Sequence, residues 1–374
     1  MSLDIEEKDR RYRLARERML TQGLDALIVV GNAQVAEKGF VKYLTNYKNG
    51  LNYVAVVFPY EGEAELLVPN TIQEYWAGRS SWIRNIRISP NLGEGLVKSL
   101  KAMGLSKARL GLINSQIIPA DAYLTLIKNC PQASVVDATR LLEELRMIKS
   151  SKEIKLIKTS AALAVLSFER LAKILRVGIT EREIVAEVDR ELIANGAEDI
   201  FHLFSSDPDN MFAAYAPTDR VIQRGDVVIM NTELNSPGGY WVQMVRTSFV
   251  GKPNENIERM YDTVLDIRLK ILEELRPNRK MSEIANALKD YIMKAGYVIG
   301  VNLGHGLGLD LVECPRVEPS EDTILAPGMV IVVHPQLVLP AGKGTIWLAD
   351  TYLVTDSGAE SLTAMDPLAI KTFD

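Results

Sequence analysis

The sequence has 374 residues, of which 47% are hydrophobic and 24% are charged, so it can form two domains with apolar cores. The net charge of −5 argues against a nucleic-acid-binding surface, and no apolar run of membrane-spanning length and no secretion signal stands out. Cys130 and Cys314 are far apart and fit no metal-binding pattern, which indicates reduced thiols in a cytoplasmic protein without a membrane partner.

The first part of the chain alternates helical and strand patterns. An amphipathic helix is predicted over residues 8–22, followed by a buried strand over 26–30 and a hairpin over 53–69. Another strand is predicted over 108–114, and a helix follows it. This alternation predicts an α/β domain over residues 1–140.

The remainder, residues 141–374, opens with two long helices. Ser150 and Glu153 form the Ser-x-x-Glu pattern of a capping box, and Thr180 and Glu183 repeat the pattern thirty residues later. A hairpin, two helices and two strand-rich segments are predicted to follow, over 225–251, 255–276, 282–295, 300–313 and 329–354. The order predicts a duplicated α-α-β-β unit, and therefore a second domain of the α+β class.

Two amide side chains stand out in the hairpin over 225–251. Asn231 and Gln243 lie almost symmetrically about its Pro-Gly-Gly turn, so we expect their side chains to converge across the two strands. Two carboxylates in these places would form half of a metal site, whereas two amides carry no charge.

Three segments show a family resemblance. The segments are "PTDRVIQRGDVVIMN", "GHGLGLDLVECPR" and "LAPGMVIVVHPQLVLPAG", and they resemble the creatinase, prolidase and aminopeptidase P family in order and spacing. The resemblance covers nearly the whole chain. It implies a creatinase-type N-terminal α/β domain followed by an α+β "pita-bread" domain.

The peptidases of this family bind two divalent metals through Asp, Asp, His, Glu and Glu, and the resemblance carries these ligands onto five positions. Only the histidine is kept; the five positions are Asn231, Gln243, His305, His334 and Ala349. A two-metal site needs several carboxylates, one of them bridging the ions. We therefore expect no metal cofactor, and a single site on the two histidines would lack a third ligand unless His202 supplied it.

Creatinase, which works without metal, is similar in other details. The loop 204–214 aligns with its active-site loop, and Arg316 falls on the arginine that grips the substrate carboxylate. The catalytic parts differ, because the general acid/base histidine falls on Ala214. The glutamates that hold the guanidinium group fall on Val245 and His334, so hydrolysis of creatine is not expected.

The cleft implied by the resemblance is neutral, polar and aromatic. His305 and His334 are the candidate catalytic pair, one as base and one as hydrogen-bond donor. Arg316 is the candidate anchor for a ligand carboxylate, and Glu313 or Glu233 could pair with it. For Glu233 we favour a solvated charge at a strand end. The expected lining is Phe201, His202, Phe204, Asn231, Glu233, Trp241, Gln243, His305, Glu313, Arg316, His334 and Trp347.

Three functions remain open from the sequence. The first is a metal-independent, creatinase-like hydrolase of a C–N bond in a small molecule that bears a carboxylate. The second is a family member without catalysis that binds a peptide or metabolite. The third is an Xaa-Pro dipeptidase or aminopeptidase with an atypical metal site.

The resemblance also implies a homodimer. In creatinase, the segment that corresponds to residues 43–53 reaches the active site of the partner subunit. The creatinase side chains that make this contact fall on Asn49 and Leu51, so a second clamp for a carboxylate is missing.

Overall fold

The protein is described by a computed structural model that covers residues 4–34, 37–207, 216–340, 344–367 and 372–373. The chain forms two compact units, one ending at Arg146 and the other beginning at Met147. The sequence predicts the boundary near residue 140. Among the described residues, no helix is long and apolar enough to cross a membrane.

The N-terminal unit contains a six-stranded mixed sheet with the strand order β4-β3-β2-β1-β5-β6. β1 pairs in parallel with β5 and antiparallel with β2. The strands are β1 (Ala26–Gly31), β2 (Val54–Pro59), β3 (Glu65–Val68), β4 (Asn85–Ile88), β5 (Arg109–Ile113) and β6 (Ser134–Asp137). The helices are α1 (Ile5–Gln22), α2 (Gly39–Thr45), α3 (Thr71–Ser80), α4 (Leu92–Ala102), η1 (Ser115–Ile117), α5 (Ala120–Asn129) and α6 (Thr139–Met147).

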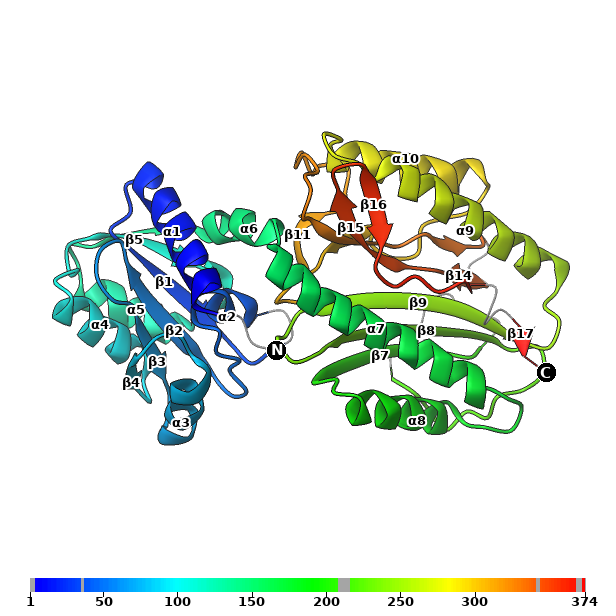
Figure 1. Ribbon diagram of the computed structural model, residues 1–374, viewed down its shortest axis with the longest axis horizontal. Coiled ribbons are helices and arrows are strands. Elements are labelled where there is room, and N and C mark those ends of the chain that lie inside the picture. Colours follow the sequence, from blue (N-terminus) through cyan, green and yellow to red (C-terminus); the bar gives the residue numbers. More distant parts are fainter. Residues whose placement is uncertain (1–3, 35–36, 208–215, 341–343, 368–371, 374) are drawn as a thin grey trace. The chain divides into compact units, whose positions relative to one another are not determined.

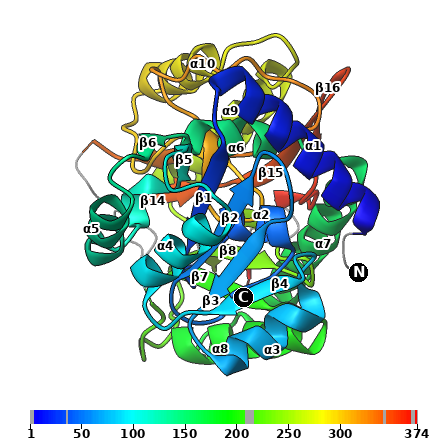
Figure 2. The same cartoon turned by 90° about the vertical axis from the view of Figure 1, so that its left-hand side faces the viewer.

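Alternation along β1 explains how this sheet is covered on both faces. Ala26, Ile28 and Val30 point into a core with buried side chains of α4 and α5. The opposite face meets α1, where the ring of Tyr12 lies 4.8 Å from that of Phe58 on β2. Figure 2 shows α4 and α5 on one side of the strands and α1 on the other. The predicted α/β class of this unit is confirmed.

The C-terminal unit contains three groups of paired strands. A four-stranded sheet has the order β17-β9-β8-β7, a five-stranded sheet has the order β11-β10-β12-β15-β16, and β13 pairs with β14. The helices are α7 (Ser151–Ile174), α8 (Glu181–Ala194), α9 (Glu255–Glu274) and α10 (Met281–Lys294). The strands are β7 (Asp199–Ser205), β8 (Val227–Asn235), β9 (Trp241–Val250), β10 (Gly304–Gly306), β11 (Glu313–Arg316), β12 (Val330–Val333), β13 (Gln336–Val338), β14 (Thr345–Trp347), β15 (Asp350–Thr355), β16 (Gly358–Ser361) and β17 (Thr372–Phe373).

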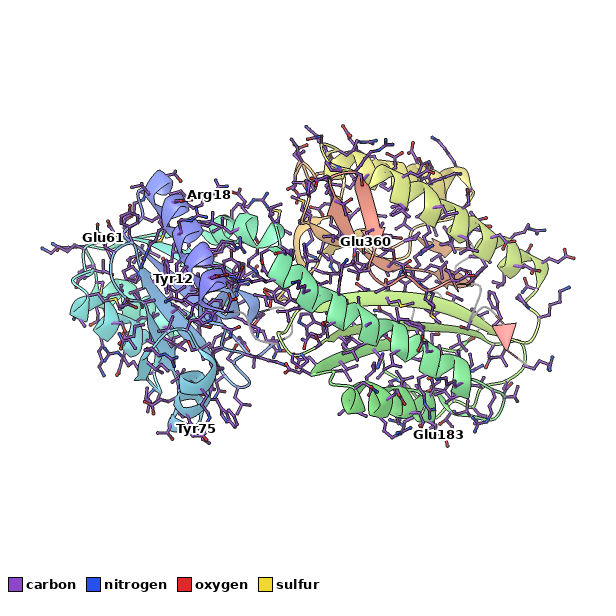
Figure 3. All side chains as sticks on the ribbon, viewed as in Figure 1. Tyr12, Arg18, Glu61, Tyr75, Glu183 and Glu360 are labelled. Carbon is purple, nitrogen blue, oxygen red and sulfur yellow. The ribbon has the colours of Figure 1, made fainter. Side chains whose placement is uncertain are left out.

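Both predicted capping boxes are confirmed. Ser150 opens α7 and Thr180 opens α8, and in each case the glutamate three residues later bonds back to the cap backbone. Glu183, labelled in Figure 3, is one of these glutamates. The sequence helix–helix–strands then recurs from α9 onward, as the predicted duplication requires.

An isolated backbone bridge near the middle of β9 joins the two sheets of this unit. Val245 forms an antiparallel bridge with Ala349, and each residue donates its backbone N–H to the carbonyl of the other, at 3.0 and 3.1 Å. Helix α7 packs against β8 and β9, and α9 packs against β14 and β16 (Figure 1). The bridge places the ends of β10 and β12 beside the hairpin β8–β9.

Candidate functional site

The hairpin β8–β9 carries a row of buried polar side chains on the face that points away from α7 and α8, which we call the inner face. The side-chain amides of Gln243 and Asn231 are in hydrogen-bond contact, with Nε2 and Oδ1 3.2 Å apart, so the predicted convergence of the two amides is confirmed. Nδ2 of Asn231 lies 2.7 Å from Oε1 of Glu233. Residues two apart on a strand share a face, and this explains why Asn231 and Glu233 lie side by side.

Two imidazoles complete the row. His305 lies in β10 and His334 directly follows β12, and the two strands pair antiparallel. Their ring centroids are 5.3 Å apart, and Nε2 of His334 is 3.1 Å from Oε1 of Gln243. The structure thus brings the two histidines together as predicted. We call the resulting group the amide–imidazole cluster; its members are Asn231, Glu233, Gln243, His305 and His334.

Both imidazoles are held in the neutral form. Burial lowers the pKa of His305 to about 4, and the positive charge of Arg316 acts in the same direction. Burial also lowers the pKa of His334 to about 3, with a contribution from His305. A buried imidazolium without an anionic partner is costly, so the neutral rings dominate near neutral pH.

Glu233 is buried, so the expectation of a solvated charge at this position is wrong. Its carboxyl group is buried on the inner face between Phe201 on β7 and Gln243 on β9. Burial raises the pKa of Glu233 to about 7, and the hydrogen bond from Asn231 only partly offsets this effect. The sequence gives no sign of this, because a glutamate in a strand is buried or exposed according to what packs above it.

Two tryptophans border the cluster, as predicted. The ring centroid of Trp347 lies 5.5 Å from that of His334. Trp241 precedes Gln243 by two residues and shares its face of β9. Both indoles are buried, and neither Nε1–H group has a hydrogen-bond partner within the described part of the chain.

His202 and Phe204 are placed differently from the prediction. They lie on the face of β7 that points toward the helices, where Nε2 of His202 meets Asp189 of α8 at 2.9 Å and Nδ1 meets Thr232 at 3.1 Å. Phe204 is fully buried on the same side. The reason is the two-residue period of a strand, which aims Phe201 inward and His202 outward.

Glu313 and Arg316, both in β11, also have different surroundings from those considered. Glu313 is buried against Lys149, with Nζ and Oε2 3.4 Å apart, and Oε1 accepts from the backbone N–H of Asp310 at 3.1 Å. Arg316 is exposed and lies opposite His305 in the register of β10 and β11. Its charge therefore needs no buried partner, and neither Glu313 nor Glu233 forms an ion pair with it.

Two parts of the site fall outside what the sequence could supply. The carbonyl of Asn302 lies 3.1 Å from Nδ1 of His334, and a backbone carbonyl leaves no signal in the sequence. Lys149 is paired with a residue 164 positions away. Ala214 and most of the predicted active-site loop lie outside the described residues.

The side chains of the cluster do not fit the two-metal centre of the peptidases. Among the described residues, no group of three or more His, Cys, Asp or Glu side chains is placed to hold a metal ion. The atoms of Asn231, Gln243 and His334 that could face an ion are used in hydrogen bonds to one another. The side chain of Ala349 has no donor atom, and His202 is on the far face of the sheet, so within the described ranges no third side chain joins His305 and His334 as a ligand.

Comparisons with known proteins agree with the fold. The chain is 31% identical over 227 residues to an Xaa-Pro dipeptidase of Pyrococcus horikoshii. The matched segment covers 60% of this chain and 64% of that protein, so the chain spans just under two thirds of the relative's length. It is 30% identical over 263 residues to an uncharacterized peptidase of Staphylococcus haemolyticus, covering 68% and 73%. The crystal structure of the prolidase from Pyrococcus horikoshii OT3 superimposes with a TM-score of 0.84 at 26% identity, covering 96% and 99%.

These names favour the third function considered above, an Xaa-Pro peptidase, over the first, a creatinase-like hydrolase. Residues 11–148 match the creatinase/prolidase N-terminal domain, and residues 155–356 match the metallopeptidase family M24, a family of hydrolases. With more than half of its length in that match, and with the two-domain fold of the prolidases, this chain belongs to metallopeptidase family M24.

Proposed function

We propose that the chain hydrolyses the amide C–N bond of a small peptide with a free carboxylate, at the amide–imidazole cluster. Xaa-Pro dipeptides are the first substrates to test, because relatives carry the name Xaa-Pro dipeptidase. The observation that carries the proposal is the open Nε2 atom of His305.

The tautomer of His305 is fixed by its backbone contact. Nδ1 lies 2.9 Å from the carbonyl oxygen of Gly306, so Nδ1 carries the hydrogen and Nε2 carries the lone pair. Within the described residues, no side chain or backbone N–H donates to Nε2. Because the pKa of His305 is about 4, this lone pair is available throughout the neutral range.

In the proposed reaction, Nε2 of His305 accepts a proton from water while the water oxygen bonds to the peptide carbonyl carbon. The tetrahedral intermediate then collapses, the C–N bond breaks, and the proton passes from His305 to the leaving nitrogen. An imidazole with so low a pKa is a weak base. We therefore expect slow turnover that is lost as the pH falls through about 4.

Arg316 supports a substrate with a carboxylate. Its guanidinium group is exposed beside His305 and forms no ion pair with a described residue. The planar fork can bind a carboxylate through two parallel hydrogen bonds, which lysine cannot reproduce. Arg316→Lys should therefore raise KM with little change in kcat, and Arg316→Ala should raise it further.

Independence from metal is part of the proposal. It is supported by the mismatch between the cluster and a two-metal donor set. A family hydrolase with this donor set must obtain its nucleophile from a protein base, and His305 is the best-placed one.

The test is hydrolysis of a panel of Xaa-Pro dipeptides by protein dialysed against a chelator, with release of the free amino acid as the readout. We expect turnover that is unchanged by added Mn²⁺, Co²⁺ or Zn²⁺ and abolished in His305→Ala. His202→Asn is the matched control, since it removes a histidine from the opposite face of the sheet. Activity that appears only with added metal would refute metal independence. Full activity in His305→Ala would refute the assigned base.

A second candidate function is binding without turnover. It is favoured by the mutual hydrogen bonding of Asn231, Gln243 and His334, which leaves few groups free for chemistry. In that case, dipeptides should raise the melting temperature of the wild type but not of Arg316→Ala, and no product should form. A ligand at a hundred times its Kd would stabilise the fold by about 2.7 kcal/mol.

We also propose that the protein is a cytoplasmic homodimer. Exposed apolar side chains gather on α3 and beside it, and such groups mark contact surfaces. They are Ile72, Tyr75 and Trp76 of α3, and Leu51, whose backbone carbonyl accepts a hydrogen bond from Gln73 of α3. Cys130 is a buried cysteine without a disulfide, which suits a reducing compartment. A monomeric mass in light scattering at micromolar concentration would contradict the dimer.

A further inference from the structure

A continuous chain of hydrogen-bonding groups runs through the amide–imidazole cluster. It starts at Glu233, passes through the side chains of Asn231 and Gln243 to His334, and ends at the carbonyl of Asn302. The successive distances are 2.7, 3.2, 3.1 and 3.1 Å. We call this the hydrogen-bond chain.

The contact with the carbonyl of Asn302, at one end of the hydrogen-bond chain, determines where the imidazole of His334 carries its hydrogen. A peptide carbonyl only accepts, so Nδ1 of His334 must carry the hydrogen in this contact. A neutral imidazole has one N–H group, and its other nitrogen therefore accepts. In the neutral ring, Nε2 of His334 thus needs a donor, and the atom facing it belongs to the amide of Gln243.

The remaining links follow one from another. If Gln243 turns its NH₂ group to His334, its oxygen faces Asn231 and needs a donor there. Asn231 must then present its own NH₂ group to Gln243, which turns its oxygen toward Glu233. Amide nitrogen and oxygen are nearly the same size, so hydrogen-bond partners decide both orientations. Glu233 can complete this order only if its carboxyl group carries a proton.

If all hydrogen bonds of the chain ran in the opposite direction, two buried groups would have to be charged. With Nδ2 of Asn231 donating to an ionised Glu233, the order ends with Oε1 of Gln243 facing His334, which must then be an imidazolium. Both charged groups would be buried and separated by two amides. Buried charges without direct partners are strongly disfavoured, so the neutral order is preferred.

In the part of the chain that the structure describes, no charged neighbour reverses this preference. Glu233 faces Phe201 on β7 and Gln243 on β9, and burial together with Asn231 sets its protonation. His334 faces His305, Trp347 and Gln243, and none of these is an anion. Arg316 and Glu313 act on His305.

We propose that Glu233 is a positioning residue whose proton fixes the two amides and makes Nε2 of His334 a hydrogen-bond acceptor. This assignment goes beyond the proposed hydrolysis and does not depend on turnover. It separates the roles of the histidines: His334 is committed to the hydrogen-bond chain, and His305 alone keeps an open lone pair. Loss of the proton from Glu233 removes the donor at one end and forces His334 to change its tautomer or break a contact.

The test is nitrogen-15 NMR of the imidazole rings across the pH range, compared between the wild type and Glu233→Gln. The chain has three histidines, so each ring can be assigned by single substitution. At about pH 6, the wild type should show His334 protonated at Nδ1 and bare at Nε2, and this state should change by about pH 8.5 as Glu233 ionises. Glu233→Gln supplies a permanent NH₂ donor and should keep the first state at every pH.

His202 is the internal control, because its contacts to Asp189 and Thr232 lie on the other face of the sheet and should not respond. Glu169→Gln, on the exposed surface of α7, is the matched control variant. If His334 is doubly protonated at about pH 6, or if its state in the wild type does not change up to about pH 8.5, the proposal is overturned.

A second measurement needs no variant. Infrared difference spectra of the wild type between the same two pH values should show a protonated carboxyl group disappearing, and Glu233→Gln should lack that change where it folds. A wild type without such a signal would also overturn the proposal. Neither spectrum measures hydrolysis, so failure of the proposed function and failure of this inference are distinguishable.

Discussion

Two buried carboxyl groups in the C-terminal unit show how partners decide charge. Glu233 lies among amides, and burial raises its pKa to about 7. Asp350 is fully buried, and burial would also raise its pKa, but Arg246 and Arg268 outweigh this effect and lower it. Equal burial therefore gives a neutral acid in one place and a fixed anion in the other. The first region can change its protonation near neutral pH, whereas the second serves as permanent structure.

The largest expected effect comes from removing the fixed anion. Asp350→Asn leaves Arg246 fully buried without its carboxylate, and Arg268 loses the same partner. We expect a loss of about 3–5 kcal/mol in the free energy of unfolding, measured by urea denaturation. Glu360→Gln is the control. Glu360 lies on β16, the strand beside that of Asp350, and forms an exposed pair with Lys158 of α7, so its loss should cost under about 1 kcal/mol. Equal losses in the two variants would contradict the comparison.

The next effect is the pH dependence due to Glu233. Its pKa in the folded state, about 7, is above the ordinary 4.5, so folding favours its protonated form. The contribution of Glu233 to the free energy of unfolding is therefore complete below pH 4.5. About 3 kcal/mol of it is lost as the pH rises to about 7. Relative to Glu233→Gln, the wild type should weaken over this window in urea denaturation. If the free energies of unfolding of the two proteins changed with pH in parallel, Glu233 would ionise in the folded state at little cost in free energy, and the prediction would be wrong.

The two buried histidines should make the free energy of unfolding change with pH in the opposite direction. The pKa values of His305 and His334 are below the ordinary 6.5, so folding favours their neutral forms. Their contribution is complete above pH 6.5 and is lost as the pH falls, by about 2 kcal/mol for His305 at about pH 5. His305→Gln should flatten this acid limb by that amount while the limb due to Glu233 remains. A variant with an unchanged acid limb would mean that His305 is protonated in the folded state.

The sequence was sufficient where the determining contacts are local or follow strand geometry. Ser150 and Thr180 were predicted as caps because their partners are three residues away. Asn231 and Gln243 were predicted to converge because the turn between them fixes the pairing of the strands. The proximity of His305 and His334 followed from the family resemblance, which orders the strands that carry them.

The sequence was insufficient where distant partners decide the environment. Glu313 was considered a partner for Arg316, yet it pairs with Lys149, 164 residues earlier in the chain. Glu233 was expected to be solvated because no neighbouring residue in the sequence indicates what covers it. His202 was assigned to the wrong face of β7, an error of one residue in a two-residue period.

The contacts of Arg246 also bear on how the chain is made. Its guanidinium bonds to Asp350, which is 104 residues later, and to the carbonyls of Ala349 and Thr363. During synthesis, the hairpin β8–β9 leaves the ribosome well before these partners exist. Since a lone arginine is costly to bury, that hairpin cannot close over it early. We therefore expect the C-terminal unit to complete its packing only after the strand that carries Asp350 has been made, whereas the N-terminal unit, whose last strand ends at residue 137, can fold before it.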